Sequence, residues 1–133
     1  MYKVSKAIEF CYGHRLLNYD GKCRHLHGHN ARAEIELKSR ELDERGMVFD
    51  FTDIKKAVKS WIDENLDHVM ILNEKDEIIP MLEEAGERFL AVSGNPTAEF
   101  ISKLIYDHVK SLGFPVISVK VWETPDSYAE YSD

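Results

Sequence analysis

The sequence predicts an α+β protein in which an antiparallel sheet carries helices on one of its faces. Three observations lead to this class. Residues 31–38 alternate apolar and charged side chains without a break, which is typical of a strand with one buried face. Residues 54–66 instead repeat apolar side chains at helical spacing. Strand-like and helical segments are also partly segregated along the chain, as they are in α+β folds.

The first two strands are expected at residues 2–10 and 31–38, and together they predict an antiparallel pair. Residues 2–10 alternate more weakly than residues 31–38. Between the two strands, residues 14–30 form a connection far longer than a hairpin requires, and long connections inside compact domains are usually functional. We therefore expect the functional site in this connection.

A first amphipathic helix is expected over residues 54–66, with Thr52 as its N-cap. The segment that follows, residues 74–94, is acidic and is expected to form a connection between the two long helices, outside the main fold. A short helix at residues 81–92 is the only regular element that its pattern indicates.

A second long helix is expected to begin at Asn95-Pro96, where a capping residue precedes a proline in the first turn. Gly113 is the expected stop of this helix. Alternation returns at residues 116–124 and predicts another strand.

The length and charge of the chain limit its function. A chain of 133 residues predicts a single domain over residues 1–133. Its net charge of -7 repels a phosphate backbone, so nucleic acid is not an expected partner. Arg15, Lys22 and Arg24 nevertheless form a local basic cluster that either binds an anionic small substrate or is a solvated loop.

The two cysteines, Cys11 and Cys23, are too few for a disulfide framework, and free thiols are the rule in a reducing compartment. No apolar run approaches the roughly 20 residues that span a membrane, and residues 1–10 carry charges where a signal peptide is apolar. A cytoplasmic protein without a membrane partner is the expectation.

His27-Gly28-His29 leads into the strand at residues 31–38. Residues two apart in an extended chain point the same way, so both imidazoles can face one ion. His14, just past the partner strand, is the best-placed third ligand. Three neutral imidazoles suit Zn²⁺ and leave one coordination position open, as in catalytic zinc sites.

Two alternatives stay open for these histidines. The triplet is also compatible with a polar turn in which the imidazoles only satisfy backbone groups. It is equally compatible with a closed structural zinc site that takes Cys23 or Cys11 as its fourth ligand.

Cys23 lies between Lys22 and Arg24, whose positive charges favour a reactive thiolate and argue against full burial. Asp67-His68 places a carboxylate beside an imidazole, which either orients a catalytic base or is an ordinary pair at a helix end. Glu123 is able to pair bidentately with a guanidine-like edge of a ligand.

In this order the motifs resemble those of the 6-pyruvoyltetrahydropterin and 6-carboxytetrahydropterin synthase family over nearly the whole chain. Any one of these motifs is weak, but six in the family's order are specific. They are residues 10–14, 23–29, 48–51 with Lys55, 66–68 with 72–73, 95–99 and 123–124.

The resemblance implies the tunnelling fold, or T-fold, with the order ββααββ. In it a four-stranded antiparallel sheet carries two helices on one face, and subunits assemble into barrels, usually a homohexamer of two trimers with active sites between subunits. The resemblance also implies roles for nine residues: zinc ligands at His14, His27 and His29, a catalytic triad of Cys23, Asp67 and His68, a pterin anchor at Glu123, and pocket residues Thr97 and Glu99.

Three residues separate Cys23 from His27, a gap similar to that of the bacterial 6-carboxytetrahydropterin synthases. The implied reaction converts 7,8-dihydroneopterin triphosphate to 6-carboxytetrahydropterin, acetaldehyde and triphosphate in queuosine biosynthesis. A 6-pyruvoyltetrahydropterin synthase or a pterin side-chain aldolase on the same scaffold is an alternative, and a zinc-stabilised binding module is a second. Cys11-Tyr12-Gly13 departs from the small residues common in the family and leaves the shape of the pocket open.

Overall fold

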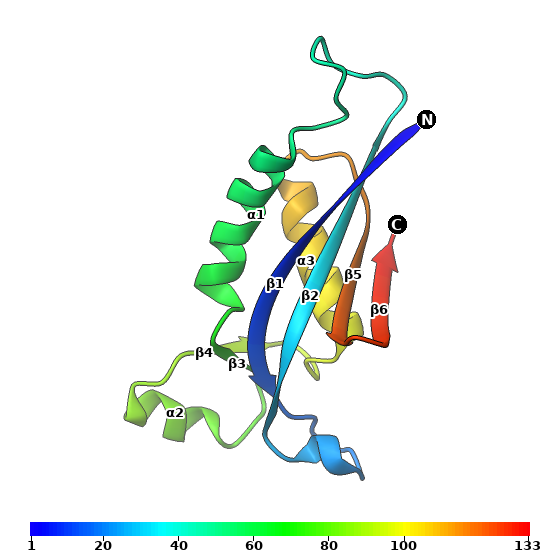
Figure 1. The fold of residues 1–133 in the computed structure, drawn as a ribbon. Helices are drawn as coiled ribbons and strands as arrows, with labels where there is room; N and C mark the ends of the chain where they lie inside the picture. Colours follow the sequence, from blue (N-terminus) through cyan, green and yellow to red (C-terminus); the bar gives the residue numbers. More distant parts are fainter.

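A computed structural model describes residues 1–133 as one twisted sheet with two long helices on one of its faces (Figure 1). The class is the predicted α+β. The strands are β1 (Tyr2–His14), β2 (His27–Ser39), β3 (Val69–Asn73), β4 (Phe89–Val92), β5 (Val116–Thr124) and β6 (Ser127–Ser132), and the helices are η1 (Lys22–Arg24), α1 (Phe51–Asn65), α2 (Ile79–Ala85) and α3 (Ala98–Ser111).

The sheet has six strands in the order β4-β3-β1-β2-β5-β6, where four were expected. Its antiparallel part, β1, β2, β5 and β6, agrees with the expected four-stranded sheet. Two short strands extend it in parallel, because β3 pairs with β1 and β4 pairs with β3. The prediction of a purely antiparallel sheet was therefore wrong at this edge.

The extra strands come from the segment after α1. The expected helix over residues 81–92 is wrong in its second half, because α2 ends at Ala85 and Gly86 adopts a left-handed φ of 72°. After this turn the chain returns as β4. Figure 1 shows α2 standing away from the main body at the end of the sheet where β1 finishes.

Each long helix has an N-cap residue two positions away from the expected one. Asp50, rather than Thr52, caps α1 by accepting a 2.8 Å hydrogen bond from the Thr52 N–H. Thr97, rather than Asn95, caps α3 by accepting a 3.2 Å hydrogen bond from the Phe100 N–H. In each case an oxygen of a side chain satisfies a free N–H of the first turn.

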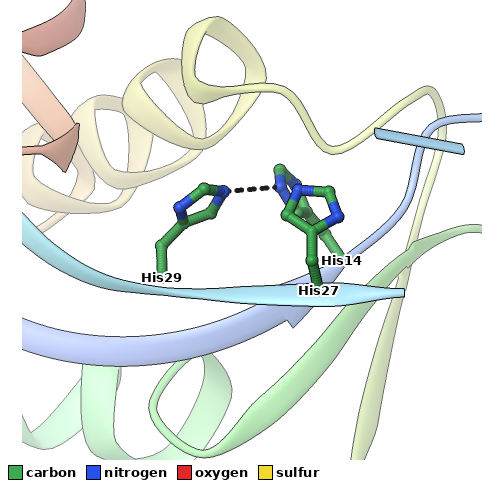
Figure 2. Close-up of side chains that lie close together, drawn as sticks. All are labelled: His14, His27 and His29. Atoms are coloured by element: carbon green, nitrogen blue, oxygen red, sulfur yellow. Dashed lines mark hydrogen bonds between the residues drawn. The ribbon is translucent and has the colours of Figure 1, made fainter. Parts of the chain in front are cut away.

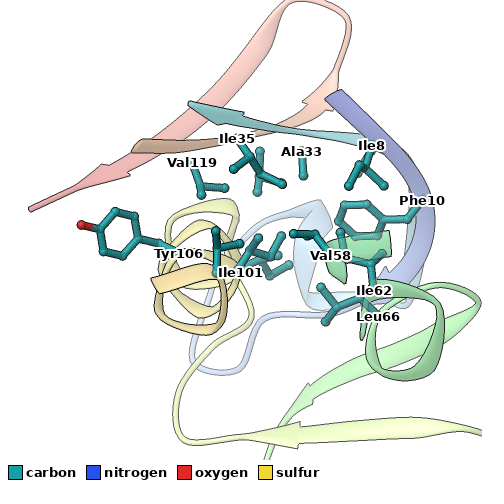
Figure 3. Close-up of a cluster of buried hydrophobic side chains, with 14 of the residues drawn as sticks. Ile8, Phe10, Ala33, Ile35, Val58, Ile62, Leu66, Ile101, Tyr106 and Val119 are labelled. Atoms are coloured by element: carbon teal, nitrogen blue, oxygen red, sulfur yellow. The ribbon is translucent and has the colours of Figure 1, made fainter. Parts of the chain in front are cut away.

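The core lies between the sheet and the two long helices (Figure 3). Alternate residues of β1, β2 and β5 face α1 and α3, for example Phe10, Ile35 and Val119. They meet helix residues at helical spacing, such as Ile62 and Ile101, which are fully buried. Each large apolar side chain buried in this way contributes about 1.5–3 kcal/mol of transfer free energy.

The two faces of the sheet differ sharply. Helices cover one face, whereas the other is more polar and open, with side chains such as Arg32 and Glu34. None of the helices is long and apolar enough to cross a membrane.

Candidate active site

Three histidines converge where β1 ends and β2 begins. In the antiparallel register His14 lies opposite His27, and Tyr12 lies opposite His29. The alternation of the two strands turns all three imidazoles to the same side of the sheet (Figure 2). Their ring centroids are 4.5 to 5.1 Å apart. The sequence-predicted metal ligands are thus brought together.

Backbone carbonyls orient two of these rings. His14 Nδ1 lies 2.7 Å from the carbonyl oxygen of Pro96, and His27 Nδ1 lies 2.7 Å from that of His25. When Nδ1–H donates to a carbonyl, the lone pair on Nε2 is free to bind a metal, which is the arrangement of metal-bound histidines.

The Nε2 atoms are then the ligand atoms of the trio. His27 Nε2 is buried and has no hydrogen-bond partner, and His14 Nε2 lies 3.1 Å from His29 Nε2. A buried nitrogen without a partner is costly unless something binds it. The donor set fits a divalent ion such as Zn²⁺, and the ligand atoms lie within 4.8 Å of one another.

The electrostatics of His14 and His29 favour neutral imidazoles. Burial lowers the pKa of His14, which is 2% exposed, and the neighbouring imidazoles lower it further. Burial also lowers the pKa of His29. Because only a neutral imidazole ligates a metal, the fold prepares these side chains for binding.

Glu123 lies beside the trio on β5. Its charge acts on both His14 and His29, raising their pKa against the larger effect of burial. The hydroxyl of Tyr12 donates a 3.2 Å hydrogen bond to Glu123 Oε1. Burial and the Glu123 carboxylate raise the pKa of Tyr12 far above its usual range, so this hydroxyl stays a donor.

The segment before α3 closes one side of the site. Asn95 fixes it by accepting a 3.0 Å hydrogen bond from the Leu17 N–H and donating a 2.8 Å bond to the Leu17 carbonyl. These two hydrogen bonds position the neighbouring Pro96, whose carbonyl oxygen is the hydrogen-bond partner of His14. Thr97 is occupied in capping α3, and Glu99 is exposed in its first turn.

The basic cluster of the loop is divided by the structure. Arg15 forms a two-pronged ion pair with Asp76, a carboxylate that is 3% exposed. It is therefore not free to hold an anion. Lys22 and Arg24 remain exposed on either side of Cys23, which is half-buried in η1.

Asp67 and His68 belong to a cluster of potential ligands separate from the three metal-ligand candidates, although His68 lines one pocket of about 690 Å³ together with His27 and His29. Within the chain their thiol neighbour is Cys11: its sulfur lies 3.5 Å from His68 Nδ1, and its N–H donates a 2.9 Å bond to Asp67. Because Cys11 alternates with Tyr12 along β1, this group lies on the open face of the sheet. Cys23 belongs to neither cluster of potential ligands.

The Asp67–His68 pair is well formed. Asp67 Oδ2 lies 2.9 Å from His68 Nδ1. Burial opposes ionisation of Asp67, but the hydrogen bonds from the Cys11 N–H and His68 outweigh it and lower its pKa. His68 also has a left-handed backbone, with φ at 55°, which only a few non-glycine residues adopt.

Sequence reasoning missed several residues that shape the site. Asp76 had no assigned role, Tyr12 was noted only as part of a departure that leaves the shape of the pocket open, and Cys11 was considered only as a competing metal ligand. Asn95 was read as a helix cap, whereas it anchors the loop after β1. A signal for Tyr12 existed, because it continues the buried alternation of β1 to the edge of the histidine trio.

Comparison with known proteins places this geometry in context. The family model described as 6-pyruvoyl tetrahydropterin synthase matches residues 3–133. A 6-carboxy-5,6,7,8-tetrahydropterin synthase of Rickettsia bellii is 38% identical, over 98% of this chain and 99% of the relative. Another, of Haemophilus influenzae, is 33% identical over the full length of both chains.

Solved structures show the same fold. An uncharacterized protein of Wolinella succinogenes superposes with a TM-score of 0.83 at 31% identity, covering 99% of this chain and 98% of the other. The 6-pyruvoyl tetrahydropterin synthase of Caenorhabditis elegans gives a TM-score of 0.72 at 23% identity, over 99% and 95% of the two chains. At that identity the second likeness speaks for the fold alone.

Proposed function

The chain belongs to the 6-pyruvoyl tetrahydropterin synthase family and is an enzyme of that type, and from this premise we propose that it is a zinc-dependent 6-carboxy-5,6,7,8-tetrahydropterin synthase. It would convert 7,8-dihydroneopterin triphosphate to 6-carboxytetrahydropterin, acetaldehyde and triphosphate, within queuosine biosynthesis in the cytoplasm. Residues 1–133 act as one domain in this proposal.

The observation that carries the proposal is the convergence of His14, His27 and His29 beside Glu123. The trio offers three imidazole nitrogens and no thiolate, which leaves an open position of the catalytic kind rather than a closed structural site. This disfavours the zinc-stabilised binding module. A carboxylate within electrostatic reach of the trio also provides a place for a guanidine-like pterin edge.

A zinc ion held by the trio would supply Lewis acidity that stabilises negative charge on the oxygens of the substrate side chain. Glu123 would hold the pterin ring, with Thr97 and Glu99 lining the same pocket. Tyr12 donates to one carboxylate oxygen of Glu123, and because each carboxylate oxygen accepts more than one hydrogen bond, both oxygens stay able to pair with the ligand.

Proton transfer would fall to Cys23 and His68, with Asp67 orienting His68. Cys23, between two exposed cations, would remove a proton from the substrate side chain. His68 would carry a second proton at its Nε2 atom, because Asp67 takes the hydrogen bond of its Nδ1 atom. Lys22 and Arg24 are the cations of this loop that remain free to attract the triphosphate.

Within one chain these groups do not form a single cluster: the three histidines form one group of potential ligands, Cys11, Asp67 and His68 form another, and Cys23 belongs to neither. The histidine trio lies on the helix-covered face of the sheet, and Asp67-His68 lies with Cys11 on the open face. We therefore propose that the protein is a homo-oligomer, a hexamer of two trimers. Each site would combine the histidine trio and Cys23 of one subunit with His68 of a neighbouring subunit.

The test is product analysis. The zinc-loaded protein is incubated with 7,8-dihydroneopterin triphosphate and the products are identified by mass spectrometry, with Cys23→Ala as a variant whose zinc content is measured. Acetaldehyde and 6-carboxytetrahydropterin, lost in Cys23→Ala, are the expected result. Pyruvoyltetrahydropterin would move the enzyme to the other branch of the family. A Cys23→Ala protein with full turnover would remove the role given to this thiol.

A further inference from the structure

We propose that Cys11, Asp67 and His68 form a second metal site, selective for a thiophilic divalent ion, on the open face of the sheet. The site is separate from the histidine trio in place and in chemistry. It rests on the arrangement of these three residues and does not require the proposed reaction.

The fold brings the three side chains together from distant parts of the chain. Cys11 comes from β1, whereas Asp67 and His68 follow the end of α1. Parallel pairing of Tyr12 with Val69 places that turn against the open side of β1, and the His68 N–H donates a 2.7 Å hydrogen bond to the Cys11 carbonyl. The contact is thus held by the backbone and not only by side chains.

The donor atoms lie close enough to share an ion once a side chain rotates. The Cys11 sulfur is nearly equidistant from the two ring nitrogens of His68, at 3.5 and 3.6 Å, so it lies over the imidazole face, and the thiol or the ring has to turn before sulfur and nitrogen bind the same ion. With Zn–S near 2.3 Å and Zn–N near 2.0 Å, two ligands of a tetrahedral ion lie roughly 3.5 Å apart. Asp67 Oδ2 and His68 Nδ1, now 2.9 Å apart, need to separate only slightly when an ion replaces the proton between them.

The charges also favour a divalent cation. Asp67 contributes a carboxylate that is held in place by hydrogen bonds with the Cys11 N–H and with His68. On binding, Cys11 releases its thiol proton to solvent, so that thiolate and carboxylate together balance the two positive charges of the ion. Sulfur, nitrogen and oxygen ligands in one site select zinc-like ions over Mg²⁺ or Ca²⁺.

In the single chain the site is open to ligands. All three residues line a groove of about 530 Å³ on the open face, together with Asn30, Arg32 and Trp122. Three protein groups converge there, so water would complete the coordination of an ion. Because this cluster is more exposed than the trio, its ion should exchange more readily.

This position gives the second ion a consequence for catalysis. Asp67 and His68 are the proton relay of the proposed reaction, and an ion bound to them takes that relay out of use. Excess metal would then inhibit the enzyme that one equivalent of metal activates.

Cobalt titration separates the two sites without measuring turnover. Metal-free protein is titrated with Co²⁺ and followed by absorption. We expect two equivalents per chain: the first, at the trio, gives only visible ligand-field bands, and the second adds a sulfur-to-cobalt charge-transfer band in the near ultraviolet. Cys11→Ser should lose this band and keep the first equivalent. Asp67→Asn removes a charged direct ligand and should weaken the second equivalent by more than the roughly 10–100-fold typical of an outer-shell partner.

Cys23→Ser is the matched control, since the chain has only these two cysteines, and it should retain the band. The proposal is overturned by saturation at one equivalent, by a charge-transfer band that survives in Cys11→Ser, or by a band that disappears in Cys23→Ser. A wild-type protein that makes no pterin product leaves the cobalt result unaffected, so the two proposals fail separately.

Discussion

The hydroxyl of Tyr12 on β1 is hydrogen-bonded to the carboxylate of Glu123 on β5, 3.2 Å away across the intervening strand β2. The Tyr12 ring also contacts two of the candidate metal ligands, with centroids 5.1 Å from His14 and 5.6 Å from His29. One buried side chain therefore connects the proposed pterin anchor with the proposed metal site.

Tyr12→Phe should weaken substrate binding without removing the metal. The change deletes a hydrogen bond to a charged acceptor, worth about 1.5 kcal/mol, and so should raise KM about tenfold. The value of kcat should change much less, and zinc content should stay at the wild-type level. Steady-state kinetics with metal analysis measure both. Tyr128→Phe, at an exposed tyrosine of β6, is the control, and an unaltered KM in Tyr12→Phe would show that Glu123 does not depend on Tyr12.

His27→Ala should abolish both tight zinc binding and turnover. It removes the imidazole whose buried Nε2 has no other partner in the fold. His25→Ala, in the same loop, is the matched control, because the His25 side chain is exposed and only its carbonyl contacts His27. Metal content after dialysis against a chelator distinguishes the two proteins. Equal zinc retention by both variants would contradict the ligand assignment.

Mixed oligomers should recover activity that neither parent has. Cys23→Ala and His68→Asn each remove one group of the proposed relay, and asparagine tolerates the left-handed backbone at position 68. When two subunits share each site, random mixing places two unaltered contributions together at about one site in four. Co-expressed variants should then show about a quarter of wild-type turnover. A mixture as inactive as its parents would place the whole site within one subunit.

Asp76→Asn should destabilise the loop that follows β1. The buried carboxylate of Asp76 accepts hydrogen bonds from Arg15 and from the Ile78 N–H, and its loss should cost about 2 kcal/mol in denaturant unfolding. Asp63→Asn, which breaks an exposed ion pair with Lys59, should cost less than about 1 kcal/mol.

The same pair predicts a pH dependence. The hydrogen bond from Arg15 lowers the pKa of Asp76 below its ordinary value of about 3.9. The unfolded chain therefore binds a proton before the folded chain does, and the stabilisation present above about pH 4 is lost as the pH falls through the folded-state pKa. Unfolding free energies measured from pH 5 downward should fall less steeply for Asp76→Asn, and identical slopes would contradict the assignment.

The sequence predicted most strongly what depends on short-range pattern. The alternation of residues 31–38 and the helical spacing of residues 54–66 each report one element and its buried face. The histidine trio could be predicted for the same reason, because His27 and His29 are two residues apart on one strand and His14 ends the neighbouring strand.

Features that depend on partners distant in the chain could not be predicted from the sequence. The contact of Cys11 with His68 joins residues 57 positions apart, and no sequence pattern near Cys11 indicates it. β3 has five residues, four of them apolar, and its parallel pairing with β1 depends on the topology of the whole chain. β6 is mostly polar and exposed, so its pattern carries little hydrophobic signal, and pairing with β5 defines it.

The left-handed backbone of His68 bears on how selection has acted on this position. A non-glycine residue held in that region costs on the order of 1 kcal/mol, which glycine would not. The chain keeps an exposed imidazole there at the expense of its own folding. Variants chosen only for thermal tolerance should therefore drift away from histidine at residue 68, whereas variants chosen for turnover should keep it.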